Sequence, residues 1–194
     1  LDEALILVKK FRETDVNTPV ILMGYTNPIE RMGYEKFIER MVVSGVDGVL
    51  TVDLPPEEAE VFNEQLRASN IENIFLLAPT SSQIRQKKVT NMAGGFVYYV
   101  SLNGVTGAAN LDVDSVKDHV SSIRALTKLP ICVGFGIKDG VTARAVADVS
   151  DGVVVGSAIV NKIADLAKLG ELDPLIYAET VSVVIKDIRD ALDK

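Results

Sequence analysis

The sequence is poor in the residues that build disulfides and metal centres. Its 194 residues contain one cysteine, Cys132, and one histidine, His119. A single cysteine cannot form an intrachain disulfide, and one cysteine with one histidine does not make a zinc site. Cys132 lies in an apolar run, which predicts an inert buried thiol, and His119 lies in a polar helical stretch, which predicts a surface residue. We expect a reducing compartment, the cytoplasm, and no metal.

Positive charge and long apolar runs are also scarce. The chain has 20 Lys and Arg against 27 Asp and Glu, which gives a formal net charge of -7. This balance argues against nucleic acid and against anionic membrane surfaces as partners. No uninterrupted apolar stretch is long enough to suggest a membrane span. The composition is 47% hydrophobic and 24% charged, which is typical of a globular domain with a sizeable core.

Apolar strand-like runs alternate with helical patterns along the whole chain. Six strands are expected, at residues 20–25, 49–52, 73–78, 96–101, 131–135 and 152–155. Helices are expected at residues 1–12, 30–44, 82–92, 112–126, 139–149 and 157–169, with two more opening at Pro55 and at Asp173-Pro174. Strands that alternate with helices pair in parallel and form a buried sheet.

The number of strands suggests most of a barrel. A (β/α)8 barrel runs to about 250 residues, or roughly 31 for each strand and helix. At that pitch 194 residues make six units, and the first helix has no strand before it. We therefore expect an α/β fold, a TIM barrel represented by strands 3–8, with the two N-terminal units absent. Residues 1–194 are expected to form a single domain, the C-terminal three-quarters of the barrel.

Three glycine motifs follow successive strands, at residues 104–107, 134–137 and 156–157. Glycine lets an anion approach the backbone, and N–H groups at a helix N-terminus then point toward it. Barrel enzymes commonly bind phosphate near the ends of their last strands. No Lys or Arg occurs within the motifs. The three together predict a phosphate site made by backbone groups, although each glycine alone could serve only a turn.

Five segments together resemble the tryptophan synthase alpha subunit family. They are residues 22–28 (LMGYTNP), 52–58 (VDLPPEE), 101–107 (SLNGVTG), 133–137 (VGFGI) and 155–160 (VGSAIV). The order and spacing agree along essentially the whole chain. The resemblance implies a lyase that splits indole-3-glycerol phosphate into indole and glyceraldehyde 3-phosphate by a retro-aldol reaction, in tryptophan biosynthesis. It also implies a beta subunit that carries pyridoxal phosphate and receives indole in an α2β2 complex, with no cofactor in the alpha subunit itself.

The resemblance also assigns roles to residues of this chain. Phosphate binding falls to Gly107, Gly136, Gly156 and Ser157. The wall around the indole ring falls to Met23, Tyr25, Leu50 and Phe135, and Tyr98 and Thr106 match residues that support a catalytic aspartate. Contact or communication with the beta subunit falls to Asn27, Pro28, Asp53 and Pro55. The family's catalytic Glu and Asp lie at the ends of the first two strands, which have no counterpart in this chain, so residues 1–194 alone are predicted to be inactive.

Purely structural roles remain possible for some of these residues. Asp53 could only order the turn that follows it, and the indole wall could be ordinary barrel core. The leading alternative function is another phosphate-binding barrel enzyme, such as an isomerase or epimerase of sugar phosphates, because such enzymes share the terminal phosphate site. A second alternative is a polypeptide that acts only as a binding partner of the beta subunit.

Overall fold

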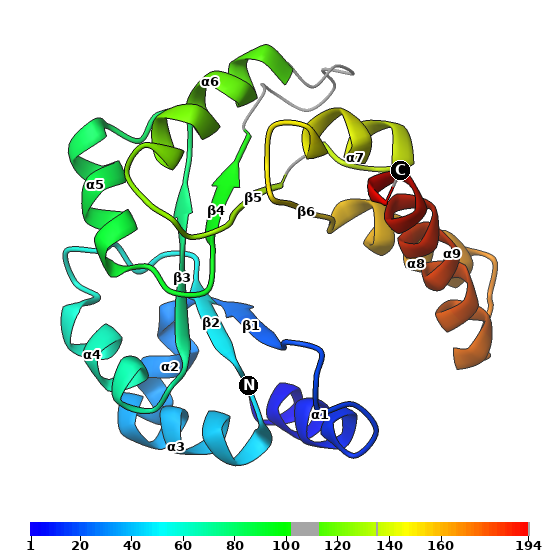
Figure 1. The fold of residues 1–194 in the computed structure, drawn as a ribbon. Coiled ribbons are helices and arrows are strands. Elements are labelled where there is room, and N and C mark those ends of the chain that lie inside the picture. The colour runs from blue at the N-terminus through cyan, green and yellow to red at the C-terminus, as the bar shows by residue number, and fades with distance from the viewer. Residues whose placement is uncertain (102–112, 135, 194) are drawn as a thin grey trace. The chain divides into compact units, whose positions relative to one another are not determined.

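The computed structural model describes residues 1–101, 113–134 and 136–193, in which helices and strands alternate (Figure 1). Its contacts group into two compact units. The first unit comprises Leu1–Leu77, Ser81–Val97 and Leu126–Leu129. The second unit comprises Ala78–Thr80, Tyr98–Ala125 and Pro130–Lys194.

The first unit contains three strands in sequence order with helices after them. Its elements are α1 (Asp2–Arg12), β1 (Ile21–Gly24), α2 (Thr26–Met32), α3 (Tyr34–Ser44), β2 (Gly48–Thr51), α4 (Glu60–Ala68), β3 (Glu72–Leu77) and α5 (Gln83–Met92). The strands pair in parallel, with Gly48 opposite both Ile21 and Glu72. All four residues of β2 are buried, as expected for a central parallel strand.

The core of the first unit lies where α1, α3 and α4 pack on the sheet. These helices bury apolar side chains at helical spacing: Leu5, Val8, Phe37, Ile38, Met41, Phe62 and Leu66. Tyr34 stacks on Phe62 with 4.6 Å between ring centroids, which joins α3 to α4. Each fully buried large apolar side chain stabilises the fold by about 1.5–3 kcal/mol, so this cluster is the main support of the unit.

The second unit contains β4 (Val97–Val100, of which Val97 belongs to the first unit), α6 (Val113–Arg124), β5 (Ile131–Gly134), α7 (Gly140–Ala147), β6 (Gly152–Val154), α8 (Ser157–Lys168) and α9 (Pro174–Leu192). Strands β5 and β6 pair in parallel. Helix α9 packs against both α7 and α8. Asp139 and Thr142 form a capping box at α7, and Asp173 caps α9, as its position before Pro174 predicts.

Two sequence expectations were wrong in detail. Residues 30–44 do not form one helix, because Gly33 takes φ 87° and separates α2 from α3. No helix opens at Pro55 either. The chain there forms a turn closed by the Glu58 amide donating to the Pro55 carbonyl at 3.0 Å, and α4 begins at Glu60. Pro56 disfavours helical backbone at Pro55, the residue before it.

The remaining strands and helices were predicted within a few residues, and the α/β class is confirmed. The single-domain expectation stays a prediction. None of the helices in the described part of the chain combines the length and the apolar composition needed to cross a membrane.

Candidate functional site

Two of the predicted phosphate-binding glycines lie just after β5 and β6 in the second unit. Gly136 takes φ 80°, a left-handed conformation that favours glycine, and it is exposed. Gly156 is the N-cap of α8, and a Cβ added to it would meet no atom within 4 Å. Among the described residues, no neighbouring atom therefore requires glycine at this position.

Ser157 begins α8 and is exposed. The first N–H groups of a helix have no partner within the helix, and the helix dipole favours an anion beside them. Helix α8 is 12 residues long, so this effect is fully developed at its N-terminus. Gly107, the fourth predicted phosphate residue, lies outside the described residues.

Gly134 and Tyr98 make a contact that sequence reasoning missed. A Cβ at Gly134 would overlap the ring and hydroxyl of Tyr98, so only glycine admits the tyrosine at this point of β5. Ser101 ties the two strands together, since its N–H and Oγ each donate to the Gly134 carbonyl at 3.0 Å. Burial raises the pKa of Tyr98, which therefore stays a neutral phenol near neutral pH. Gly134 thus leaves room for the Tyr98 ring against β5, whereas the sequence motif suggested only a phosphate loop.

The predicted indole-wall residues of the first unit lie on adjacent strands. Met23 of β1 and Leu50 of β2 are direct partners in the parallel register and hence share one face of the sheet. Met23 is 61% exposed and Leu50 only 3%. Met23 is therefore accessible to a ligand, whereas Leu50 lies buried beside it. Tyr25 follows β1, caps α2 and is 63% exposed. Phe135, the fourth residue of the predicted wall, and the supporting Thr106 both lie outside the described residues.

A hollow of about 280 Å³ brings some of these residues together. Met23, Tyr25 and Pro28 line it, with Leu1, Ala4, Leu22, Gly24, Ile29, Phe37 and Val49. Leu50 is not among its walls, because Val49 occupies the alternate face of β2. The lining is almost entirely apolar, but it includes Leu22 and Val49, which are register partners on the face of the sheet opposite to Leu50. This hollow is therefore not a pocket shared by the predicted indole-wall residues.

Asp53 has a structural task at the end of β2. Its Oδ1 accepts hydrogen bonds from the Thr26 amide at 2.7 Å and from the Thr26 hydroxyl at 2.8 Å. These bonds, the backbone one first, lower the pKa of the Asp53 carboxyl. The carboxylate thereby holds the first turn of α2, which carries the exposed Asn27 and Pro28. Pro55 is half-buried in the turn that follows Asp53.

Neither His119 nor Cys132 is placed quite as predicted. His119 is half-buried rather than exposed, because its ring stacks on Tyr99 with 5.7 Å between centroids and its Nδ1 contacts the Ser115 carbonyl oxygen at 2.7 Å. Cys132 is half-buried rather than fully buried. Burial, with a smaller contribution from Asp151, raises the pKa of the Cys132 thiol, so the thiol remains protonated and unreactive near neutral pH.

Comparisons with known proteins agree on one family. The family model described as tryptophan synthase alpha chain matches residues 1–183. The tryptophan synthase alpha chain of Thioalkalivibrio sulfidiphilus is 52% identical over 193 residues, which cover 100% of this chain and 71% of the relative. That of Burkholderia lata is also 52% identical, and 69% of it is covered. The chain thus spans about 70% of the length of these relatives.

Solved structures extend the agreement to the fold. Tryptophan synthase subunit alpha from Legionella pneumophila superposes with a TM-score of 0.87 at 39% identity, over 99% of this chain and 69% of that one. A Pyrococcus furiosus structure described as the tryptophan synthase α2β2 complex superposes with a TM-score of 0.82 at 34% identity, over 100% of this chain and 74% of that one. Six barrel-type βα units and these relatives confirm the expected fold class and leave no support for a sugar-phosphate isomerase or epimerase. The chain belongs to the tryptophan synthase alpha chain family, the lyases of tryptophan biosynthesis that cleave indole-3-glycerol phosphate to indole and glyceraldehyde 3-phosphate.

Proposed function

We propose that residues 1–194 supply the phosphate cradle, the indole wall and the beta-subunit contacts of a tryptophan synthase alpha subunit, and that they do not cleave the substrate by themselves. The observation that carries this proposal is the open backbone at Gly156, at the N-terminus of α8. Such a site holds phosphate without a basic side chain. Gly107, Gly136 and the Ser157 hydroxyl complete the proposed cradle.

Substitution at Gly156 tests the cradle. Gly156→Val fills space that the protein itself leaves empty, so the protein should fold normally while a glycerol phosphate loses its place. We expect binding of glycerol 3-phosphate, measured by calorimetry, to weaken by about tenfold or more, or at least ~1.4 kcal/mol. Lys162→Ala on the same helix is the matched control and should change binding little.

Gly136→Val should weaken binding too, but its positive φ strains any side chain and confounds the result. Gly156 is therefore the cleaner position. A greater loss in Lys162→Ala than in Gly156→Val would show that a basic side chain, and not the backbone, holds the phosphate.

The proposed indole wall consists of Met23, Tyr25, Leu50 and Phe135. The register supports this assignment, because Met23 and Leu50 are direct partners and share one face of the sheet. Tyr98 and Thr106 are proposed to position a catalytic aspartate through their hydroxyl groups. The seating of Tyr98 on Gly134 supports its part, because the contact fixes the direction of the phenol.

Residues 1–194 alone are proposed to lack lyase activity. General acid–base groups contribute about 10²–10⁴-fold each, and the family's catalytic Glu and Asp have no counterpart in this sequence. Asp53 does not replace them: hydrogen bonds to Thr26 lower its pKa, so it stays ionised and is a poor proton donor near neutral pH. Indole release by the purified 194-residue chain should be at background level. Release at a rate near that of the Burkholderia lata relative would contradict the proposal.

The proposed partner is a tryptophan synthase beta subunit, which would carry the pyridoxal phosphate, while this chain needs no cofactor. The α2β2 description of the Pyrococcus furiosus relative supports the assembly. Asn27, Pro28, Asp53 and Pro55 are the proposed contacts, in a cytoplasmic complex. A binding assay with a beta subunit, run beside the indole-release assay, separates an inactive binding partner from a chain that does neither.

A further inference from the structure

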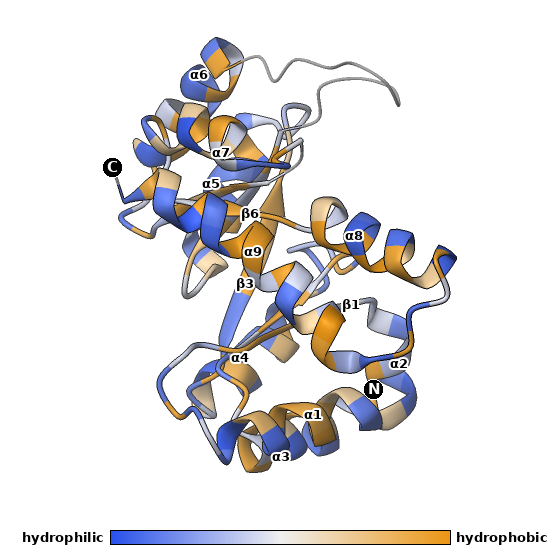
Figure 2. Ribbon diagram, turned by 90° about the vertical axis from the view of Figure 1, so that its right-hand side faces the viewer, coloured by the Kyte–Doolittle hydropathy of each residue, from blue (hydrophilic) through white to orange (hydrophobic). Residues whose placement is uncertain are grey.

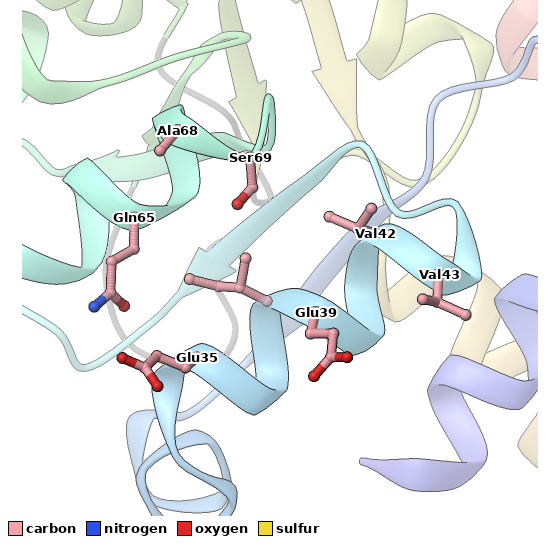
Figure 3. Close-up of a pocket in the computed structure, with 8 residues that line it drawn as sticks. Glu35, Glu39, Val42, Val43, Gln65, Ala68 and Ser69 are labelled. Atoms are coloured by element: carbon pink, nitrogen blue, oxygen red, sulfur yellow. The ribbon is translucent and has the colours of Figure 1, made fainter.

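A groove of about 440 Å³ runs between α3 and α4 in the first unit (Figure 3). Its walls are Glu35, Ile38, Glu39, Val42, Val43, Gln65, Ala68 and Ser69. None of the residues proposed above for phosphate, indole or beta-subunit contact lines it. The floor is apolar, and Val42 and Val43 of α3 are 51% and 68% exposed. This surface is therefore separate from the proposed site and has no use in it.

Two of the four polar side chains that line the groove are carboxylates, which only accept hydrogen bonds when ionised, whereas Gln65 and Ser69 also carry donors. Glu35 and Glu39, one helical turn apart on α3, form no ion pair with any described residue, and no Lys or Arg lines the groove. Across from them, the side-chain oxygen of Gln65 is buried and has no hydrogen-bond partner in the described part of the chain. A buried acceptor without a donor is unfavourable by about 1–3 kcal/mol. The groove thus combines apolar contact surface with two exposed carboxylates that have no ion-pair partner among the described residues and with one buried acceptor.

We propose that this groove docks a basic amphipathic helix of a partner protein. Leucine-type side chains on one face of such a helix would cover Ile38, Val42 and Ala68. Lysine and arginine have long alkyl stems that pack on apolar surface and heads that carry only donors, which matches Glu35 and Glu39. A second copy of this chain is a poor occupant, because a symmetric contact would place each Glu35 and Glu39 near the same carboxylates of the other copy.

Two synthetic peptides and three variants of the full 194-residue chain test the proposal. The first peptide is a labelled helix with leucine on one face and lysine beside it, and the second has glutamine in place of every lysine. Fluorescence anisotropy measures their binding to the unchanged chain, to Glu35→Gln/Glu39→Gln and to Val42→Lys. The control is Glu13→Gln/Glu179→Gln, which removes the same charge at exposed positions outside the groove.

We expect the lysine peptide to bind the unchanged chain and the control equally, more weakly as salt is raised. Loss of two surface ion pairs of about 0.2–1 kcal/mol each corresponds to two- to thirtyfold weaker binding to Glu35→Gln/Glu39→Gln. Val42→Lys should also weaken binding, because it interrupts the apolar floor and adds a like charge. Equal binding to the control and to both groove variants, equal binding of the glutamine peptide, or no binding of either peptide would overturn the proposal. So would self-association of the unchanged chain that Val42→Lys abolishes, since a second copy would then be the occupant.

Discussion

Both units have an Asp-Gly pair at the start of a strand. Comparison of the two pairs suggests how burial affects the contribution of one motif to the free energy of unfolding. In the first unit, the Asp47 amide donates to the Val20 carbonyl at 2.9 Å, and Asp47 Oδ2 accepts from the Val20 amide at 2.6 Å. The same oxygen accepts from Arg12 Nη2 at 2.5 Å. Arg12 is the last residue of α1, so one carboxylate ties a helix end to the starts of two strands.

The second unit repeats this arrangement. The Asp151 amide donates to the Ile131 carbonyl at 3.0 Å, and Asp151 Oδ2 accepts from the Ile131 amide at 2.8 Å and from Arg124 Nη2 at 2.6 Å. Arg124 is the last residue of α6. Here too the aspartate stands immediately before a strand, β6, and the arginine ends the helix before the neighbouring strand. In both units, the same three groups, an aspartate carboxylate, an arginine side chain and a backbone amide, join a helix end to the starts of two neighbouring strands.

The surroundings of the two arginines differ. The side chain of Arg12 is 15% exposed, and that of Arg124 is 45% exposed. Arg12 also donates to three backbone carbonyls, those of Gly45 at 2.8 Å, Asp15 at 3.1 Å and Thr18 at 2.8 Å. For Arg124, the carboxylate of Asp151 is the hydrogen-bond acceptor found among the described residues. Arg12 is thus less exposed and more extensively hydrogen-bonded than Arg124, although Asp47, at 49% exposed, is no more buried than Asp151, at 39%.

The second unit is less buried in its last elements as well. No residue of β6 or α8 is buried, whereas all of β2 is. Figure 2 shows hydrophobic residues along α8 and α9. Val160 and Ile163 of α8 are 61% and 40% exposed, and Val183 of α9 is 67% exposed. The same Asp-Gly motif is therefore expected to contribute less to stability where the packing around it is looser.

The largest contrast is expected between the two arginines. Arg12→Met keeps much of the alkyl stem but removes the donor of three carbonyls and the charged partner of Asp47, which keeps only its bond from the Val20 amide. The free energy of unfolding should therefore fall by about 2–3 kcal/mol. Arg124→Met removes an exposed pair and should reduce it by about 0.5–1 kcal/mol. Urea unfolding followed by circular dichroism measures both. Losses of equal size would show that burial of the arginine does not determine how much the Arg–Asp clamp, the hydrogen-bonded arginine–aspartate pair of each unit, contributes to stability.

A smaller contrast is expected between the two glycines of the motif. A Cβ at Gly48 would lie 2.8 Å from Ile74 Cδ1 and 3.0 Å from the Glu72 carbonyl oxygen and Ile21 Cδ1, inside the core. A Cβ at Gly152 would crowd chiefly Cys132 Sγ, at 3.0 Å, in a half-buried strand. Gly48→Ala should therefore reduce the free energy of unfolding by about 1–2 kcal/mol. Gly152→Ala should stay within about 0.5 kcal/mol of the unchanged chain, because alanine also restricts the unfolded chain.

Thermal unfolding of the two alanine variants checks this pair, with Cys132→Ala as a second change beside Gly152→Ala. If crowding by the sulfur is the cause of any loss in Gly152→Ala, removal of the sulfur should restore stability. A Gly152 variant less stable than the Gly48 variant would mean that the second unit is the more tightly packed at this position.

The elements could be predicted from sequence because their signals are local. Ser82 and Asp173 mark helix starts by their capping chemistry, and each accepts the expected backbone hydrogen bond. The break at Gly33 could not be predicted, because a glycine inside a helical pattern is often tolerated and only its positive φ reveals the break.

The site was less predictable than the fold. The motif predicts a phosphate role for Gly156, which stays a prediction; the structure shows that this residue is the N-cap of α8. The seating of Tyr98 on Gly134, and the hydrogen bonds of Asp53 to Thr26, join residues 36 and 27 positions apart and depend on strand packing. Such contacts leave no periodic signal. The Arg–Asp clamps are missed for the same reason, although the repeated Asp-Gly pair offered a sign of them.

The smallest effect concerns acid. Burial raises the pKa of Asp151, but hydrogen bonds from the Ile131 amide and Arg124 and the charge of Arg124 outweigh it, and the net pKa is lowered. A depressed folded-state pKa stabilises the fold above the unfolded pKa of about 4, and this contribution is lost as pH falls through the folded value. Asp151→Asn should therefore be less stable than the unchanged chain at about pH 6, and the difference should narrow by about pH 3. Urea midpoints at both pH values measure the narrowing, with Asp148→Asn, an exposed partner of Arg144, as the control. A constant difference across this range would mean that the Asp151 carboxyl acts through geometry alone and that its charge adds nothing to the clamp.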